Sequence, residues 1–357
     1  MREIKMSGIK MRGNRLAPKA DSLSQTIIAA FICVLLAAAY FMKMDAQALI
    51  SDSLVRIGMN AIFVLAMLPS IQCGVGLNFG LPLGILCGLV GGLMTIEYQM
   101  TGFAGVFVAM GISIPLAILT GLAYGWLLNR MKGSEMMVGN YLNFSIVSLM
   151  CIGWLVLPFR NPSIVWVMGK GVRSTITLEN NYEKVLDRLW QIRLGESLVI
   201  PTGTLLLAAL LCLAMWLFLK SKLGIMMRSS GSNPAFGASI GIDNDKMRLL
   251  GTVISTVLGA VGIIVYAQSF GFYQLYNASI MMAYPAISAI LIGGATTKKA
   301  GISHVLIGVC LYQLLLTIAL PVASQAMADS SLSEILRTIV SNGIILYALT
   351  KMEGRKV

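Results

Sequence analysis

The stretch that decides the fold is residues 57–96, which reads IGMNAIFVLAMLPSIQCGVGLNFGLPLGILCGLVGGLMTI. It contains no Asp, Glu, Lys or Arg. A helix needs about 20 mainly apolar residues to cross the hydrocarbon core of a bilayer, so the stretch is long enough for two crossings. The Gly-rich run Cys73–Gly80, followed by Pro82, disfavours helix and separates the two.

The rest of the chain has the same character, with 57% hydrophobic and only 12% charged residues among 357. A soluble protein carries about twice that share of charge. We therefore predict an all-α polytopic membrane protein with about ten transmembrane helices in one domain, residues 27–350, between a basic arm (1–26) and a short tail (351–357). The predicted spans are Ile27–Met44, Leu54–Gln72, Gly80–Ile96, Phe103–Leu128, Met136–Pro158, Leu198–Leu219, Leu249–Gln268, Ser279–Gly293, Ile302–Val322 and Ile335–Thr350.

The distribution of charge predicts the orientation. With a cytoplasmic amino terminus, 18 of the 27 Lys and Arg residues face the cytoplasm, and 9 of the 15 acidic residues face the other side. This is the bias that sets membrane topology. We expect both termini in the cytoplasm, a cytoplasmic loop at 220–248 and an extracytoplasmic loop at 159–197. The net charge of +12 then suits an anionic leaflet, and no nucleic-acid partner is needed.

Several kinds of chemistry are excluded by composition. His304 is the only histidine and the six cysteines form no Cys-x-x-Cys pair, so a metal centre or a Ser-His-Asp triad is not expected. No Gly-x-x-x-x-Gly-Lys-Ser/Thr loop occurs, so the chain is not its own ATPase. We expect no enzyme activity and no cofactor. Four long runs lack the acid or base that ion-coupled carriers place in the membrane: Ile57–Ile96, Tyr98–Asn129, Leu249–Thr297 and Ala300–Ala328.

Glycines recur at every fourth residue after the first break, at Gly76, Gly80, Gly84, Gly88 and Gly92. On a helix this spacing makes a stripe without side chains, along which another helix can approach closely. The stripe either packs tightly against a neighbour or lines a path for a solute.

A similar break returns about 200 residues later at Phe270–Ser279, with Asn277 in the place that Asn78 occupies in the first. The two breaks follow spans of opposite direction, which predicts an inverted internal repeat of the kind that transporters use. Asn78, Asn277, Asn143 and Tyr284 offer amide and hydroxyl groups to a solute and are the candidate path residues. The alternative for each is a hydrogen bond that secures a helix end or buried backbone.

The centre of the cytoplasmic loop, residues 228–243, reads RSSGSNPAFGASIGID. Asn233 followed by Pro234 is typical of a helix start, and Gly241 of a helix end. The pattern predicts a two-turn helix of small residues with Phe236 and Ile240 as apolar knobs, suited to the groove of another protein. The simpler interpretation is a loop that merely connects two spans.

These segments resemble a known family. Residues 224–243 resemble the coupling loop of membrane permeases from ribose, simple-sugar and nucleoside ABC importers, in the branched-chain amino acid/ribose permease superfamily. Residues 73–80 and 135–144 resemble two further motifs of that family, and the resemblance extends over about Leu54–Thr350. The chain departs from the family pattern at Gly76, where the family has Asp, and at Thr296–Ala300. The loop residues that match are Arg228, Gly231, Asn233, Gly237, Ala238, Gly241 and Ile242.

The resemblance implies a type II importer-like fold in a bacterial-type plasma (inner) membrane, with two permeases, two cytoplasmic ATPases that hold ATP and Mg, and an extracytoplasmic binding protein. It implies import of a neutral sugar or nucleoside. The main alternative is a stand-alone secondary carrier of a neutral solute, and an intramembrane enzyme is a more distant one. The residues expected to couple to the ATPase are Arg228, Gly231, Asn233, Pro234, Ala235, Phe236, Gly237, Ala238 and Gly241.

Two expectations concern partners. The departures at Gly76 and Thr296–Ala300 favour pairing with a second, different permease over pairing with itself, because a heterodimer lets one subunit lose a group that the other retains. In the extracytoplasmic loop, Leu178–Leu194 has near-helical apolar spacing. It either lies on the membrane surface or meets the binding protein.

Overall fold

The computed structural model describes residues 18–166, 171–194, 198–326 and 343, and these are mostly helical. The last predicted span, Ile335–Thr350, and the tail 351–357 lie outside the described residues, as do residues 1–17 of the arm. The first five helices are α1 (Pro18–Phe41), α2 (Ala46–Gln72), α3 (Leu81–Glu97), α4 (Gly102–Arg130) and α5 (Glu135–Val156). The later helices are α6 (Thr202–Lys220), α7 (Lys222–Ser232), α8 (Pro234–Ser239), α9 (Asn244–Phe270), α10 (Ala278–Ile292) and α11 (Ile302–Ala326).

Two short two-stranded sheets accompany the helices. β1 (Thr175–Thr177) pairs antiparallel with β4 (Phe272–Gln274), and Ile176 is opposite Tyr273. β2 (Ile192–Leu194) pairs antiparallel with β3 (Leu198–Ile200). The predicted span from Leu198 is therefore wrong at its start, because its first residues form β3 and α6 begins only at Thr202.

Helices α2, α3 and α9 form the buried centre of the fold, and the glycine stripe explains how closely they pack. A Cβ added at Gly84 would lie 2.2 Å from the carbonyl oxygen of Thr256, and one at Gly88 would lie 2.5 Å from that of Ala260. Both carbonyls belong to α9. The stripe thus lets the backbones of α3 and α9 touch, which confirms the expected close approach.

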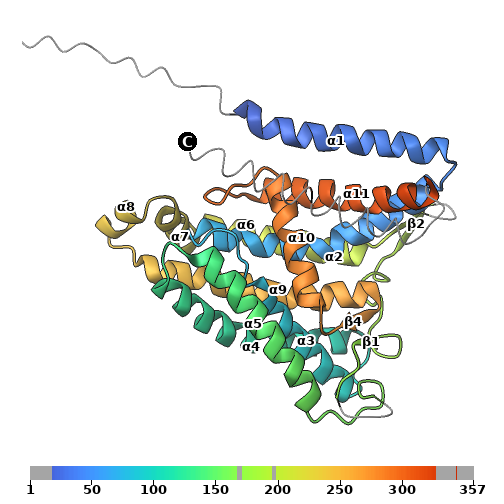
Figure 1. Cartoon of the computed structure of the whole chain (residues 1–357), viewed down its shortest axis with the longest axis horizontal. Coiled ribbons are helices and arrows are strands. Elements are labelled where there is room, and N and C mark those ends of the chain that lie inside the picture. The colour runs from blue at the N-terminus through green and yellow to red at the C-terminus, as the bar shows by residue number, and fades with distance from the viewer. Residues whose placement is uncertain (1–17, 167–170, 195–197, 327–342, 344–357) are drawn as a thin grey trace, which may run out of the picture.

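The two breaks lie at opposite ends of the helices (Figure 1). The break Cys73–Gly80 lies at the end that carries α7, α8 and the loop 293–301, which we call the α8 end. The second break contains β4 and lies with β1 at the other end, the loop end, where Glu97 accepts hydrogen bonds from the backbone N–H groups of Arg160 and Asn161. This arrangement is consistent with an inverted repeat.

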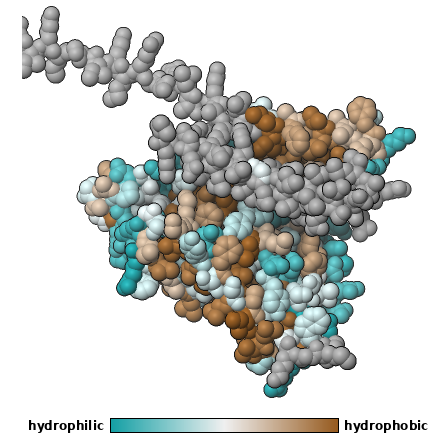
Figure 2. All heavy atoms as spheres, viewed as in Figure 1, coloured by the Kyte–Doolittle hydropathy of each residue, from teal (hydrophilic) through white to brown (hydrophobic). Residues whose placement is uncertain are grey.

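Among the described residues, six helices are long and apolar enough to cross a membrane: α2, α4, α5, α6, α9 and α11. The apolar parts of α1, α3 and α10 are shorter. Each of these nine helices corresponds to a predicted span, and the number ten remains a prediction. Many large apolar side chains on α4, α5 and α6 are exposed, and hydrophobic residues cover much of the face in Figure 2. The chain is a multi-pass membrane protein.

Helix α2 begins at Ala46, eight residues before the predicted start. Asp45 caps it, since its carboxylate accepts hydrogen bonds from the backbone N–H groups of Gln47 (2.9 Å) and Ala48 (3.3 Å). The predicted span began later because residues 46–53 include the polar Ser51 and Ser53. Both serines are buried.

The predicted helical segment Leu178–Leu194 is instead a series of turns followed by β2. Lys184 and Trp190 have left-handed backbone, with φ of 54° and 53°, which interrupts a helix. Tyr182 is fully buried, and its hydroxyl lies 3.1 Å from both Tyr273 Oη and Thr95 Oγ1. The apolar spacing therefore reflects anchoring to the protein's own core, whereas Trp190 is exposed.

Candidate functional site

Helix α8 forms as its sequence predicts. Asn233 Oδ1 accepts a hydrogen bond from Phe236 N (3.0 Å), Pro234 is the first helical residue, and Gly241 has a φ of +80°. Such a cap satisfies a backbone donor that the first turn would otherwise leave free. Asn244, the first residue of α9, donates a hydrogen bond from its Nδ2 to Pro234 O (2.8 Å), and this bond joins the first residues of α8 and α9.

Asp243 fixes the start of α9. It accepts a hydrogen bond from the backbone N–H of Lys246 (3.1 Å) and contacts the Lys246 ammonium at 3.1 Å. These interactions hold the pKa of the Asp243 carboxyl below its ordinary value. The carboxylate is therefore charged near neutral pH, as a cap at a helix N-terminus favours.

Helix α8 has one attached face and one free face. Gly237 is buried, and a Cβ there would lie 2.9 Å from Asn244 Oδ1. Phe236 and Ile240 are 53% and 56% exposed, and Ala238 is exposed as well. Gly237 therefore contacts its own chain, whereas Phe236 and Ile240 are on the exposed side of the segment. The coupling role of these residues stays a prediction.

The segment before α8 touches the first break directly. A Cβ at Gly231, in the last turn of α7, would lie 2.1 Å from Gln72 O and 2.7 Å from Gly74 N. Gly74 has a φ of +85°, and a Cβ there would lie 3.0 Å from Gly231 Cα. Glycine at both positions thus lets two backbones meet where α2 ends. The backbone of α7 is therefore in direct contact with the break, with no side chain of either glycine between them.

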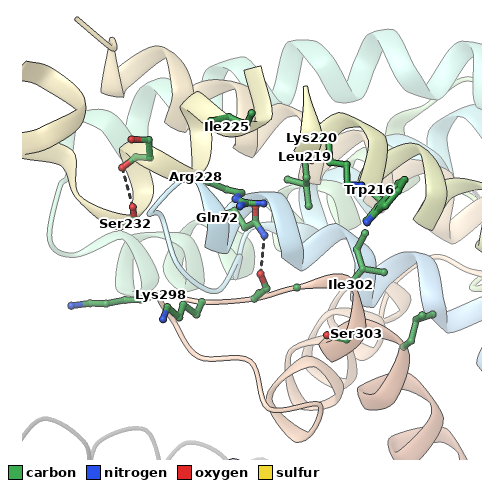
Figure 3. A pocket seen from close by; sticks show the side chains of 15 residues that line it. Gln72, Trp216, Leu219, Lys220, Ile225, Arg228, Ser232, Lys298, Ile302 and Ser303 are labelled. Atoms are coloured by element: carbon green, nitrogen blue, oxygen red, sulfur yellow. Dashed lines mark hydrogen bonds between the residues drawn. The ribbon is translucent and has the colours of Figure 1, made fainter. Parts of the chain in front are cut away.

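Beside this contact lies a groove with a volume of about 1000 Å³ between α6, α7 and the start of α11. In Figure 3, Arg228 and Lys220 lie on one wall, Lys298 and Ile302 lie on the other, and Gln72 lies between them. Gln72 Nε2 donates a hydrogen bond to Ala300 O (2.8 Å), which links α2 to the loop 293–301. Arg228 is the one predicted coupling residue that lines the groove.

A polar link between α9, α4 and α5 was not predicted. Arg248 forms an ion pair with Glu135 (2.7 Å), and the two side chains are only 13% and 14% exposed. Arg248 Nε also donates to Asn129 Oδ1 (3.0 Å). No local pattern marks this pair, because its members are more than 100 residues apart. The link fixes the start of α5 against the start of α9.

Among the candidate path residues, Asn78 is satisfied within the protein. It is 1% exposed, its Nδ2 donates to Ser255 Oγ (2.7 Å) and its Oδ1 accepts from Gly80 N (2.9 Å). Ser255 in turn donates to Ala66 O (2.6 Å). These bonds secure the break against α9, and the Asn78 side chain is buried away from solvent in this structure.

Tyr284 and Asn143 lie where α10, α3 and α5 contact one another. Tyr284 donates a hydrogen bond from its hydroxyl to Asn140 Oδ1 (2.9 Å), and its ring lies edge-on to Phe79 at 6.4 Å. Asn143 is 1% exposed, and its Oδ1 has no hydrogen-bond partner in the part of the chain that the structure describes. A buried acceptor without a donor is costly. Asn140 was not among the predicted path residues, although it lies one turn before Asn143 in the segment 135–144.

Asn277 is separate from this group. It precedes α10 at the loop end, where its side chain is exposed and makes no cap hydrogen bond to the helix. The structure therefore brings Tyr284 and Asn143 to one region, keeps Asn78 inside the first break and leaves Asn277 near the loop end.

Comparison with known proteins finds membrane permeases among the relatives of this chain. The chain is 25% identical to the galactofuranose transporter permease protein YtfT of Escherichia coli (strain K12), over 64% of this chain and 62% of the relative. It is 29% identical to the nucleoside ABC transporter permease protein NupC of Lactococcus lactis subsp. cremoris (strain MG1363), over 27% of this chain and 30% of the relative. It is 26% identical to the autoinducer 2 import system permease protein LsrC of Enterobacter sp. (strain 638), over 53% of this chain and 51% of the relative.

Each match spans less than two thirds of the relative's own length. No solved structure gives a significant match. The family match is broader, because residues 49–349 fit a single family description and include both breaks, α8 and the Arg248–Glu135 link. The chain therefore belongs to the family described as branched-chain amino acid transport system / permease component.

Proposed function

We propose that this chain is the transmembrane subunit of an ATP-driven importer that moves a neutral sugar or nucleoside into the cytoplasm. The α8 end faces the cytoplasm and carries an ATPase subunit, which holds ATP and Mg. The loop end faces outward and receives substrate from a binding protein. The membrane is a bacterial-type plasma (inner) membrane, and both termini are cytoplasmic. Family membership and the names of the relatives support this proposal.

One observation carries the coupling role: α8 is held on one face and exposes apolar side chains on the other, next to the helix break. Phe236 and Ile240 offer a partner two exposed apolar side chains, whose removal from water would favour binding. Asn244 and Gly237 attach α8 to the rest of the chain. A force on α8 therefore reaches α7, and through Gly231 it reaches the break.

The substrate class rests on the absence of charge. The charge-free runs place no acid or base within the described parts of α3, α9, α10 and α11 apart from residues at their ends. A path between these helices suits a solute that exchanges hydrogen bonds. We propose that Asn143 and Tyr284 contact it, since the Asn143 acceptor has no hydrogen-bond donor among the described residues and the Tyr284 hydroxyl donates to another side chain, that of Asn140. Asn277 lies at the outer mouth, and Asn78 acts through the break that it secures.

Purification and reconstitution test this function. The chain is expected to co-elute with an ATPase subunit, and uptake by vesicles that contain the complex is expected to require ATP. Phe236→Ser should lower co-elution, whereas Gly111→Ala, in α4 where an added Cβ meets nothing within 4 Å, should not. Full uptake by this chain alone, without ATP, would instead establish the stand-alone carrier.

We further propose that the second permease of the complex is a different chain. At Gly76 the backbone has a φ of +93°, and a Cβ would lie 2.9 Å from Met136 Cε. The Asp of the family pattern is therefore strained here, and the partner permease can supply the lost carboxylate. Mass measurement of the purified complex checks the idea. Two copies of this chain and no second permease would contradict it.

A further inference from the structure

We propose that the groove between α6, α7 and the start of α11 binds an anionic phospholipid. The phosphate lies among its basic residues, and an acyl chain lies along its apolar wall. This inference requires that the chain spans a membrane and rests on the proposed function only for the cytoplasmic position of the α8 end, so it stands apart from the proposal of ATP-driven import. Four cations line the groove, and none of the described residues that line it is acidic; the cations are Lys220, Arg228, Lys298 and Lys299.

The apolar wall is formed by two helices of membrane-spanning length. Trp216 belongs to α6 and Leu306 to α11, both helices that are long and apolar enough to span a bilayer. The two side chains are 44% and 47% exposed, so the wall is open to hydrocarbon. Contact with a hydrophilic protein segment would bury little apolar surface against this wall, whereas contact with an acyl chain buries apolar surface on both sides and is favourable.

The cations lie at the ends of these spans. Lys220 is the last residue of α6, and Lys298 and Lys299 shortly precede Ile302, the first residue of α11. Lys220 Nζ lies 3.5 Å from the centre of the Trp216 ring, which is the arrangement of a tryptophan and a lysine at a membrane–water boundary. Basic pockets between transmembrane helices on the cytoplasmic side favour anionic headgroups.

The floor of the groove adds a polar group. Gln72 Nε2 donates to Ala300 O, and Gln72 Oε1 is buried without a hydrogen-bond partner among the described residues. A headgroup hydroxyl, as in phosphatidylglycerol, supplies the donor that this oxygen lacks. The bound lipid then contacts both α7 and the loop 293–301, next to the first break.

Fluorescence quenching tests the proposal on the full chain in vesicles. The probes are phosphatidylglycerol and phosphatidylcholine with identical brominated acyl chains, and the groove signal is the quenching that Trp216→Phe removes. We expect phosphatidylglycerol to be preferred. Lys298→Gln should reduce this preference about fivefold, since one basic residue near an anionic headgroup contributes a factor of this order. Lys222→Gln, exposed on α7 but outside the groove, should change it less than about twofold.

Three results would overturn the proposal. Equal quenching of Trp216 by the two lipids would mean that the groove does not select an anion. Displacement of the brominated lipid by glycerol 3-phosphate would mean a site for a free phosphate compound. Loss of the preference when the ATPase subunit binds would mean that the groove is a protein contact.

Discussion

Replacing Gly231 by alanine should uncouple ATP hydrolysis from uptake. The added Cβ would lie 2.1 Å from Gln72 O and 2.7 Å from Gly74 N. Both neighbours are backbone atoms, so no side-chain rotation relieves the clash. The backbones of α7 and the break must separate by about 1 Å, and overpacking of this kind costs about 1–3 kcal/mol.

We expect the effect at the upper end of that range, because the break is also held by Ser70, which donates to Gly76 O (2.9 Å), and cannot move freely. A loss of about 3 kcal/mol in the contact corresponds to about a hundredfold change in an equilibrium constant. Uptake per ATP hydrolysed should therefore fall at least about tenfold, while ATP hydrolysis by the assembled complex continues.

The assay measures ATP hydrolysis and solute uptake in the same proteoliposomes, after the complex has been shown to assemble. Gly111→Ala is the matched control, because a Cβ at Gly111 of α4 meets nothing within 4 Å. If Gly231→Ala behaves like Gly111→Ala in both measurements, the contact between α7 and the break does not transmit motion.

Four further changes test other parts of the structure. Phe236→Ser should leave thermal unfolding of the chain unchanged, since the ring is 53% exposed, and weaken ATPase binding by at least about 1 kcal/mol; unchanged binding would argue against the knob. Asn143→Leu should lower uptake without loss of stability, because it removes an unpaired acceptor; normal uptake would remove Asn143 from the path. Asn78→Leu breaks two buried hydrogen bonds and should lower the free energy of unfolding by about 2 kcal/mol; an unchanged melting temperature would contradict this. Arg248→Met should lower the free energy of unfolding by about 2–3 kcal/mol, because the Glu135 carboxylate then remains largely buried without a cation. Lys132→Met, which breaks an exposed ion pair, should lower it by less than about 1 kcal/mol. Equal losses for the two variants would refute the distinction.

Local patterns predicted those parts of the fold that local chemistry determines. Asn233 and Pro234 start α8 because the cap and the fixed proline φ need no distant partner. Gly84 and Gly88 predicted a close helix contact, although the sequence could not say that α9 is the partner. The spans followed from hydrophobic length alone, which the bilayer dictates.

The errors arose where distant contacts override local spacing. Leu178 and Tyr182 have helical spacing, yet both are buried in the core, and the pairing of β1 with β4 joins segments about 100 residues apart. The candidate site shows the same limit. Asn78 and Asn143 could not be distinguished from the sequence. The structure shows that the Asn78 amide donates a hydrogen bond to Ser255, whereas the Asn143 oxygen has no hydrogen-bond partner among the described residues.

The pairing of β1 with β4 also has a mechanical consequence. Thr177 is opposite Phe272, so the chain between them, which runs through α6, α7, α8 and α9, forms a closed frame fastened at the loop end. Gln268 near the end of α9 lies within hydrogen-bond distance of Thr204 near the start of α6 (3.4 Å), close to the same fastening. If α8 is pulled, α6 and α9 therefore share the load, because the chain that contains both helices is joined at the loop end by the β1–β4 pairing and by the contact between Gln268 and Thr204.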